Sequence, residues 1–356
     1  MTVPPAGFAG HVLRWQQSHG RSGLPWQHTQ DPYRVWLSEI MLQQTQVATV
    51  LGYYARFLAR FGNVKALAAA ELDEVYACWS GLGYYSRARN LHRCARDVVA
   101  LHGGEFPRSA EILQTLPGIG RSTAAAIASF CFGERVAILD GNVKRVLTRV
   151  LGFDADLSTP ANERSLWSHA EALLPRRAVR DSMPGYTQGL MDLGSTVCLP
   201  RKPNCLLCPV SGLCRAREQG NPEHYPVKTR KLKRSAQSLW LLQAQAADGS
   251  VWLEKRPATG IWAGLYCLPV FESRDALHDA VPSRARPGLQ DHAPFLHVLT
   301  HKDLHLHRVA ARFDRKSMKD PRGAWFGAEE LTQLGLPAPV RRLLETAIAC
   351  PARGGA

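Results

Sequence analysis

The sequence predicts two domains, an all-α first half followed by a second domain of mixed α and β structure (α+β). The 356 residues exceed one average domain, and a hydrophobic content of 45% is enough to bury two cores. Apolar residues recur every three or four positions as far as about Gln219, whereas strand-like patterns begin only after Ser235. We therefore expect a helical domain over residues 1–219, a linker over 220–235, a mixed domain over 236–349 and a tail over 350–356.

Local patterns predict the elements of each domain. In the first domain, helical spacing is clearest over Val35–Leu51, Leu67–Trp79 and Leu91–Leu101, and none of these stretches alternates with the period of a strand. The second domain is predicted to contain strands over Leu239–Ala244, Val251–Lys255 and Leu304–Phe313, a turn at Asp248–Ser250 and a closing helix over Val340–Ala349.

The chain is strongly basic, with a formal net charge of +14 and a pI near 9.6. This balance favours a polyanionic partner, with nucleic acid as the first candidate and an anionic membrane surface as the alternative. Residues 220–235 contain two prolines and five lysines or arginines, which is typical of a linker that stays close to DNA. A merely solvated run of charge explains them equally well.

The sequence carries no recognisable targeting signal. Met1–Gly10 has no basic start with a long apolar run, and no later stretch approaches the roughly 18 apolar residues of a membrane helix. We therefore expect an intracellular, cytoplasmic protein that associates with the nucleoid and with no membrane.

The stretch Leu116–Arg145 combines a hairpin with an acid. Pro117, Gly118 and Gly120 interrupt one helix, and small residues follow that allow a second helix to pack closely. Backbone N–H groups at such a helix start bind a phosphate without reading base sequence. Asp140 then ends the apolar run that precedes it and begins another helical pattern.

Two carboxylates are candidate catalytic groups, and each also has a simpler explanation. Glu39 lies among apolar neighbours, so desolvation can raise its pKa and keep a proton available for general-acid catalysis, unless it is an ordinary surface glutamate. Asp140 stands where an N-cap aspartate is expected, and capping amides would hold it ionised and oriented. Capping and catalysis are therefore compatible.

Four of the nine cysteines lie within seventeen residues, with the spacing C-x6-C-x2-C-x5-C: Cys198, Cys205, Cys208 and Cys214. Four thiolates in one loop suit either a tetrahedral zinc or a 4Fe-4S cluster. A single C-x2-C pair favours the cluster over zinc, which more often uses two such pairs. Such a group would shape a basic loop that carries Arg201 and Lys202, or act only as a structural staple.

Taken together, five motifs resemble the adenine DNA glycosylase (MutY) branch of the endonuclease III, or helix-hairpin-helix, superfamily. They are LSEIMLQQTQVATV, GLGYYSRARNL, LPGIGRSTA, ILDGNVKRVL and the four-cysteine loop, and the resemblance runs from about Leu24 to about Ala349. It implies an enzyme of base excision repair that flips adenine out of a mispair with 8-oxoguanine, or with guanine, and removes it.

The resemblance also implies roles for individual residues. Glu39 would protonate adenine, Asp140 would stabilise an oxocarbenium-like sugar, and the four cysteines would hold a 4Fe-4S cluster. Asn142 and Gln188 match positions near the water and the flipped base. The residues that match positions contacting or wedging against the opposite base are Gln43, Gln44, Thr45 and Tyr84.

Ser122 bears on the reaction type. Bifunctional relatives carry a lysine at this position, and its amine forms a Schiff base that leads to strand cleavage. Serine cannot form that imine. We therefore expect a monofunctional glycosylase that leaves an abasic site in an intact strand.

The second domain resembles the MutT (Nudix hydrolase) fold without its magnesium-binding signature. The acids after Gly264 are Glu272, Asp275 and Asp279, and no Arg-Glu-x-x-Glu-Glu cluster is present. Leu299, Thr300 and His301 match a loop that reads 8-oxoguanine in the family and usually begins with Phe and Ser. The resemblance therefore implies a domain that recognises 8-oxoguanine without hydrolysing a nucleotide.

Three other functions remain as alternatives. One is a DNA-binding module that cuts no bond, another is a thymine-mismatch or lyase-type relative, and the third is a Nudix pyrophosphatase. Ser122 disfavours the lyase, and the missing acids disfavour the pyrophosphatase. The expected partner is double-stranded DNA with A:8-oxoG or A:G mispairs, bound by a monomer. Contacts with repair or replication proteins are not readable from the sequence.

Overall fold

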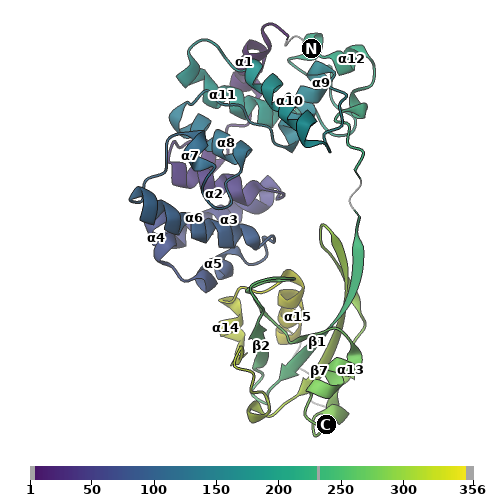
Figure 1. The fold of residues 1–356 in the computed structure, drawn as a ribbon. Coiled ribbons are helices and arrows are strands. Elements are labelled where there is room, and N and C mark those ends of the chain that lie inside the picture. The colour runs from purple at the N-terminus through teal and green to yellow at the C-terminus, as the bar shows by residue number, and fades with distance from the viewer. Residues whose placement is uncertain (1–4, 231–232, 350–356) are drawn as a thin grey trace. The chain divides into compact units, whose positions relative to one another are not determined.

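The computed structural model describes residues 5–230 and 233–349, which form two compact units (Figure 1). The first contains residues 5–54, 63–68 and 93–230, and the second contains residues 55–62, 69–92 and 233–349. Helices α3 (Val47–Arg60) and α6 (Ser86–His102) run from one unit into the other. The predicted tail, residues 350–356, lies outside the described part of the chain.

The first unit is all-α, as predicted. Its elements are α1 (Phe8–His19), η1 (Pro25–Gln27), α2 (Pro32–Leu42), α4 (Val64–Ala69), α7 (Ala110–Leu113), α8 (Arg121–Phe132), α9 (Gly141–Leu151), α10 (Pro160–Ala172), α11 (Val179–Asp192), η2 (Leu193–Val197), η3 (Ser211–Leu213), α12 (Arg215–Glu218) and η4 (Pro222–His224). A buried apolar core joins α1, α8, α9, α10 and α11.

The predicted hairpin is present between α7 and α8. Gly118 adopts a φ of +79°, a left-handed conformation that glycine tolerates best, and Gly120 is the N-cap of α8. The residues from Ala124 to Ala128 are all buried, which lets α8 pack closely on α2 and α11. The hairpin therefore presents the start of α8 next to a rigid core.

Two of the predicted helical stretches are each divided into two helices. The range Val35–Leu51 breaks at residues 43–46, where Gln44 has a φ of +57° between α2 and α3. The range Leu67–Trp79 breaks between α4 and α5 (Leu72–Trp79). Residues 43–46 are all polar, but neither break contains a glycine or proline, so the sequence carried no strong stop signal at either position.

The mixed α and β structure of the second domain is confirmed. Its central strands are β1 (Ser235–Gln245) and β7 (Lys302–Arg312), which pair in parallel with Leu239 opposite Leu306. The other strands are β2 (Val251–Lys255), β3 (Tyr266–Cys267), β4 (Val270–Phe271), β5 (Gln290–Asp291), β6 (Phe295–Val298) and β8 (Gly323–Phe326). The sheet order is β3-β2-β1-β7-β5, with β4 on β1, β6 on β7 and β8 on β2.

Helices cover both faces of this sheet (Figure 1). Helix α15 (Ala338–Ala349) and α14 (Ala328–Thr332) contribute Leu331, Val340 and Leu344 to one apolar core. Helix α13 (Arg274–Ala280) contributes Leu277 to a second core on the opposite face. Residues Leu241–Ala244 of β1 and Val251–Leu253 of β2 are buried consecutively, because the sheet is covered on both faces.

Much of the basic stretch predicted as a linker lies against the first unit. The Leu157 amide donates to the Val227 carbonyl over 3.0 Å, and the Thr229 amide donates to Asp156 Oδ1 over 3.2 Å. The Thr229 hydroxyl also bonds to Asp156 Oδ2, and the Arg230 amide donates to Ser158 Oγ. The described residues up to 230 are thus held by the helical unit, and β1 begins at Ser235. Among the described residues, no helix is long and apolar enough to cross a bilayer.

Candidate active site and cysteine cavity

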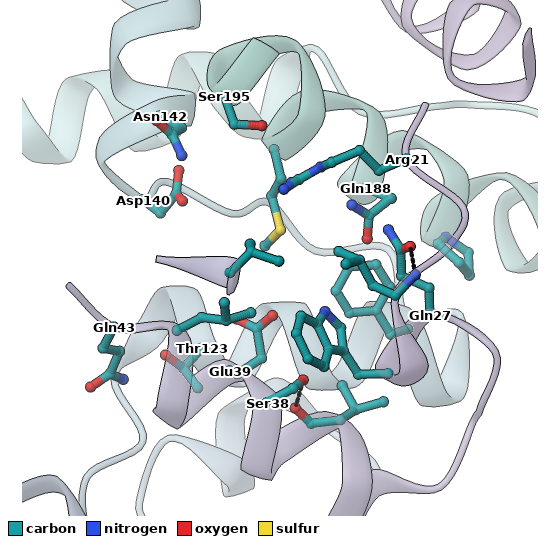
Figure 2. Close-up of a pocket in the computed structure, with 18 of the residues that line it drawn as sticks. Arg21, Gln27, Ser38, Glu39, Gln43, Thr123, Asp140, Asn142, Gln188 and Ser195 are labelled. Carbon is teal, nitrogen blue, oxygen red and sulfur yellow. Dashed lines mark hydrogen bonds between the residues drawn. The ribbon is translucent and has the colours of Figure 1, made fainter. Parts of the chain in front are cut away.

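A cleft of about 1400 Å³ in the first unit collects most of the predicted catalytic and base-contacting residues (Figure 2). It lies between α2, the starts of α8 and α9, α11 and the segment before η1. The predicted residues that line it are Glu39, Gln43, Gln44, Thr45, Ser122, Asp140, Asn142 and Gln188. This volume is larger than a typical small-molecule pocket, so it has room for a base with its attached sugar and phosphate.

Glu39 is a half-buried carboxyl that faces the cleft from α2. Its neighbours Trp36, Leu37 and Ile40 are buried. Burial, with a smaller contribution from the nearby charge of Asp140, raises the pKa of Glu39 to about 8. A surface glutamate is therefore excluded, and Glu39 holds a proton at neutral pH.

Asp140 is the N-cap of α9, as predicted, and its carboxyl also lines the cleft. Its Oδ1 accepts a hydrogen bond from the Val143 amide over 2.7 Å. Burial raises the pKa of Asp140, although the amides of Val143 and Asn142 and the charges of Arg145 and Lys144 oppose this shift. Glu39 has no comparable donors, so Asp140 is the carboxyl of the pair that ionises more readily.

Asn142 is held in the cleft by Arg145, one turn further along α9. Arg145 Nη2 donates to Asn142 Oδ1 over 2.8 Å, and Arg145 Nε donates to the Cys198 carbonyl over 2.7 Å. With its oxygen engaged by Arg145, Asn142 can direct its amide nitrogen as a donor. Figure 2 shows Asp140 and Asn142 side by side at the start of α9.

Ser122 lies close to the backbone that carries Asp140. Its Oγ accepts a hydrogen bond from the Leu139 amide over 3.1 Å. The hydroxyl therefore holds the residue that precedes the acid. No lysine lines the cleft among the described residues.

Arg21 and Asp192 form a buried pair at the cleft that the sequence did not reveal. The Asp192 side chain is fully buried and accepts from the Arg21 amide over 2.9 Å and from Arg21 Nε over 2.7 Å. It also accepts from Gln188 Nε2 over 2.9 Å. The two residues are 171 positions apart, so spacing offered no signal; the only hint was an acid inside the otherwise apolar sequence LMDLG.

The Asp192 carboxylate fixes how Gln188 faces the cleft. An ionised carboxylate only accepts hydrogen bonds, so it takes the amide nitrogen of Gln188 and leaves the oxygen for a ligand. Gln27 supplies a donor to match this acceptor. Its buried Nε2 has no hydrogen-bond partner among the described residues, while its Oε1 accepts from the Leu24 amide. The cleft thus offers one acceptor and one donor, both visible in Figure 2.

Three residues predicted to contact the opposite base lie at the edge of the cleft, where α2 ends. They are Gln43, Gln44 and Thr45. The left-handed backbone of Gln44 is unusual for a residue with a side chain, and such strain is often found at binding sites. Gly118 and Gly120 lie outside the cleft lining, in the hairpin that precedes α8.

Tyr84, Thr300 and His301 belong to the second unit. The hydroxyls of Tyr84 and Thr300 are 2.9 Å apart, and Arg87 lies over the Tyr84 ring at 5.4 Å. Tyr84 is 44% exposed and has a φ of +48°. His301 is exposed, and its carbonyl accepts from the Ser235 amide. The structure therefore brings Tyr84 and Thr300 together within one unit.

The four cysteines line one largely apolar cavity in the first unit, between α9, η2 and the loop before α12. Burial raises the pKa of the Cys208 thiol, a hydrogen bond from the Val210 amide opposes the shift, and the charges of Cys198, Cys214 and Cys205 add to it, which gives a pKa of about 12. Four sulfur donors around one cavity are the ligands that an iron–sulfur group takes, so the donor set fits such a group.

No group of three or more His, Cys, Asp or Glu side chains in the described ranges converges closely enough to hold a single metal ion. The four cysteines line one cavity, and their spacing is what favours a cluster over zinc. Glu272, Asp275 and Asp279 of the second unit form no such group either.

Comparison with known proteins identifies relatives of both halves of the chain. Residues 37–171 match the HhH-GPD superfamily of base excision DNA repair proteins, and residues 240–346 match the NUDIX domain. An adenine DNA glycosylase of Buchnera aphidicola subsp. Acyrthosiphon pisum (strain APS) is 35% identical over 343 residues, 95% of this chain and 97% of that protein.

Two further comparisons concern mainly the helical half. The adenine DNA glycosylase of Homo sapiens is 46% identical over 226 residues, 61% of this chain and 40% of that protein. A thermostable thymine-DNA glycosylase of known structure is 31% identical with a TM-score of 0.52, over 60% of this chain and 95% of that one. The helical domain therefore has the helix-hairpin-helix glycosylase fold, and the C-terminal domain is Nudix-like.

Proposed function

Because the chain belongs to the adenine DNA glycosylase family, we propose that its substrate is adenine mispaired with 8-oxoguanine or guanine in double-stranded DNA. It binds this DNA as a monomer, removes the adenine and leaves an abasic site in an intact strand. The observation that carries this proposal is the pairing, in one cleft, of a protonated Glu39 with a more readily ionised Asp140.

The first step is recognition of the flipped adenine. An adenine edge presents an amino donor beside a ring-nitrogen acceptor. The free oxygen of Gln188 matches the amino group, and the unpaired Nε2 of Gln27 matches the ring nitrogen. Guanine presents a carbonyl acceptor where adenine has its amino donor, so Gln188 disfavours it.

The second step is cleavage of the glycosidic bond. Adenine is a poor leaving group as an anion, so Glu39 donates its proton to a ring nitrogen before the base departs. The sugar then acquires oxocarbenium character, and the nearby Asp140 carboxylate stabilises that positive charge. Water, oriented by the Asn142 amide as a donor, attacks the sugar carbon and passes a proton to the Glu39 carboxylate left by the first transfer, which restores the acid.

Ser122 supports the monofunctional reaction. A lyase needs an amine to attack the sugar carbon, and the group at this position is a hydroxyl engaged with the Leu139 amide. We therefore assign hydrolysis without a covalent enzyme–DNA intermediate.

The remaining contacts concern the rest of the DNA. The hairpin with Gly118 and Gly120 offers backbone amides to a phosphate. The base opposite the flipped adenine is contacted by Gln43, Gln44 and Thr45. Tyr84 wedges against that opposite base. Thr300 and His301 read 8-oxoguanine. The high positive charge of the chain, +14, supports each of these contacts with a polyanion.

Cys198, Cys205, Cys208 and Cys214 would hold a 4Fe-4S cluster, because their thiols line one cavity. When bound, such a cluster would supply a redox-active centre and tie together the loop of residues 198–214 that carries its four ligands. The residues of this chain that shape its surroundings are Arg145 and Arg149, which bind the backbone of the loop.

The deciding experiment is product analysis on duplexes with adenine opposite 8-oxoguanine, guanine and thymine. We expect free adenine and an abasic site from the first two, with strand breaks only after alkali. A Glu39→Gln variant is the control for borohydride trapping. Trapping of the wild type above that control would refute the monofunctional reaction, and no base release at all would favour a module that only binds DNA.

A further inference from the structure

The side chain of Arg149 is buried in the first unit, beside the cysteine cavity. It lies in the last turn of α9 and is 2% exposed. Its side chain lines the cavity together with the four cysteines. A buried charge of this kind is costly unless it is neutralised, so its surroundings require an explanation.

The contacts of Arg149 all reach the loop or the segment that follows it. Its Nη1 donates to Cys198 Sγ over 3.3 Å and to the Leu199 carbonyl over 2.7 Å. Its Nη2 donates to the Pro200 carbonyl over 3.0 Å, and its Nε donates to the Tyr225 carbonyl over 3.3 Å. The guanidinium is thus satisfied as a donor by neutral carbonyls and one sulfur.

These contacts leave the charge of Arg149 without a carboxylate partner. Of the ion pairs among the described residues, none includes Arg149. Carbonyl groups satisfy its hydrogen bonds but carry no net charge. The remaining candidates for a counter-charge are the sulfur atoms of the cavity that it lines.

A second contact ties the same residue to another cysteine. The Arg149 carbonyl accepts from the Cys214 thiol over 3.4 Å, so the backbone and the side chain reach two different ligand candidates. Arg145, one turn earlier, makes a different contact, because it binds the Cys198 carbonyl and not the sulfur. Arg149 is therefore the arginine of α9 whose side chain donates to a cysteine sulfur.

We propose that Arg149 is a positioning residue for the cysteine-bound cluster, and that its guanidinium donates to the Cys198 sulfur and offsets the negative charge of the four sulfurs. This inference rests on the cluster included in the proposed function. Four thiolates outweigh the positive charge of an iron–sulfur core, so a loaded cavity is anionic and supplies the missing counter-charge. A donor to a ligating sulfur also withdraws electron density from it, which makes the cluster easier to reduce.

The test compares full-length wild type, Arg149→Met, Arg149→Lys and a matched control, Arg87→Lys. Arg87 is also a buried arginine that donates to carbonyls, those of Leu82 and Gly83, but it belongs to the second unit. Iron and sulfide content, visible absorbance during chelation and the midpoint potential are measured, with circular dichroism as the check on folding. Wild type without iron and sulfide would refute the cluster itself and not only the role of Arg149.

In Arg149→Met we expect about tenfold faster loss of the visible absorbance under chelation and a more negative midpoint potential. Arg149→Lys keeps the charge but loses the planar set of donors. Its absorbance should therefore be lost at a rate between those of the wild type and Arg149→Met, and its midpoint potential should still be more negative than that of the wild type. Arg87→Lys should match the wild type in both readouts. If Arg149→Met does not fold, Arg149→Lys decides. A folded, loaded Arg149 variant with the wild-type loss rate and potential would overturn the proposal.

Discussion

The Ser122 hydroxyl accepts a hydrogen bond from the Leu139 amide over 3.1 Å, directly before Asp140 in the chain. The interaction connects the start of α8, which follows the hairpin, to the start of α9, where Asp140 acts as the N-cap. Leu139 is buried, so its amide has no access to water as a substitute acceptor. Ser122 thus holds the residue that precedes the acid.

Replacement of Ser122 by alanine should leave the Leu139 amide unsatisfied and let Asp140 shift. We expect a loss of about 1–3 kcal/mol in the free energy of unfolding and a fall of roughly tenfold to a hundredfold in single-turnover adenine excision. Ser129→Ala is the matched control, because Ser129 lies in the same helix and bonds to Thr187 inside the core. Equal loss of excision in both variants would show that Ser122 acts through stability alone.

The raised pKa of Glu39 predicts how excision depends on pH. Glu39 acts while protonated, so the rate should fall as the pH rises through about 8, where it loses its proton. Glu39→Gln should reduce excision by about 10²–10⁴-fold and abolish this alkaline limb. The measurement is the single-turnover rate from pH 6 to about 10. An alkaline limb that survives in Glu39→Gln would assign it to another group.

The same shift predicts a change in stability of known sign. Folding raises the pKa of Glu39 from 4.5 to about 8, so the stability associated with its neutral form is fully present below 4.5 and is lost as the pH rises through about 8. At about pH 9, Glu39→Gln should therefore be more stable than the wild type, by on the order of 2–4 kcal/mol. Urea unfolding at about pH 6 and 9 checks this prediction. If the free energies of unfolding of Glu39→Gln and the wild type differed by the same amount at both pH values, the prediction would be contradicted.

Asp192→Asn tests the buried pair that orients Gln188. An asparagine cannot accept from Arg21 and Gln188 as a carboxylate does, so we expect a loss of about 2 kcal/mol in stability and slower adenine excision. Affinity for the abasic product should change less, because no adenine remains to be oriented. Glu74→Gln, which breaks the exposed pair with Arg60, is the control and should cost less than about 1 kcal/mol. Excision at the wild-type rate in Asp192→Asn would exclude this orienting role.

Thr300→Val removes the hydroxyl that meets Tyr84 at 2.9 Å. We expect the preference for adenine opposite 8-oxoguanine over adenine opposite guanine to fall by roughly threefold to tenfold, as the loss of about one hydrogen bond implies. Competition between the two duplexes measures the preference. Thr332→Val removes a hydroxyl from α14 in the same unit and should leave it unchanged. A preserved preference in Thr300→Val would remove this residue from the reading of 8-oxoguanine.

Several features could be predicted from the sequence because the necessary signal is local. The hairpin depends on Gly118, the N-cap on Asp140, and the strands β1 and β2 on short apolar stretches joined by a turn, and all three are confirmed. The break between α2 and α3 was not predicted, because residues 43–46 contain no glycine or proline to signal it and the left-handed backbone falls on Gln44. The Arg21–Asp192 pair was also missed, since its partners come from distant parts of the chain.

The sequence by itself determined the chemical groups of this protein: two candidate acids, a serine in place of a lysine, four clustered cysteines and an excess of positive charge. It left open whether Glu39 was a surface residue, because solvent exposure depends on what packs around a side chain. The tertiary structure decided that question by placing Glu39 with Asp140 in one cleft, where burial and a neighbouring charge raise its pKa to about 8. A pKa is set by the environment that distant segments create, and residue type alone cannot specify it.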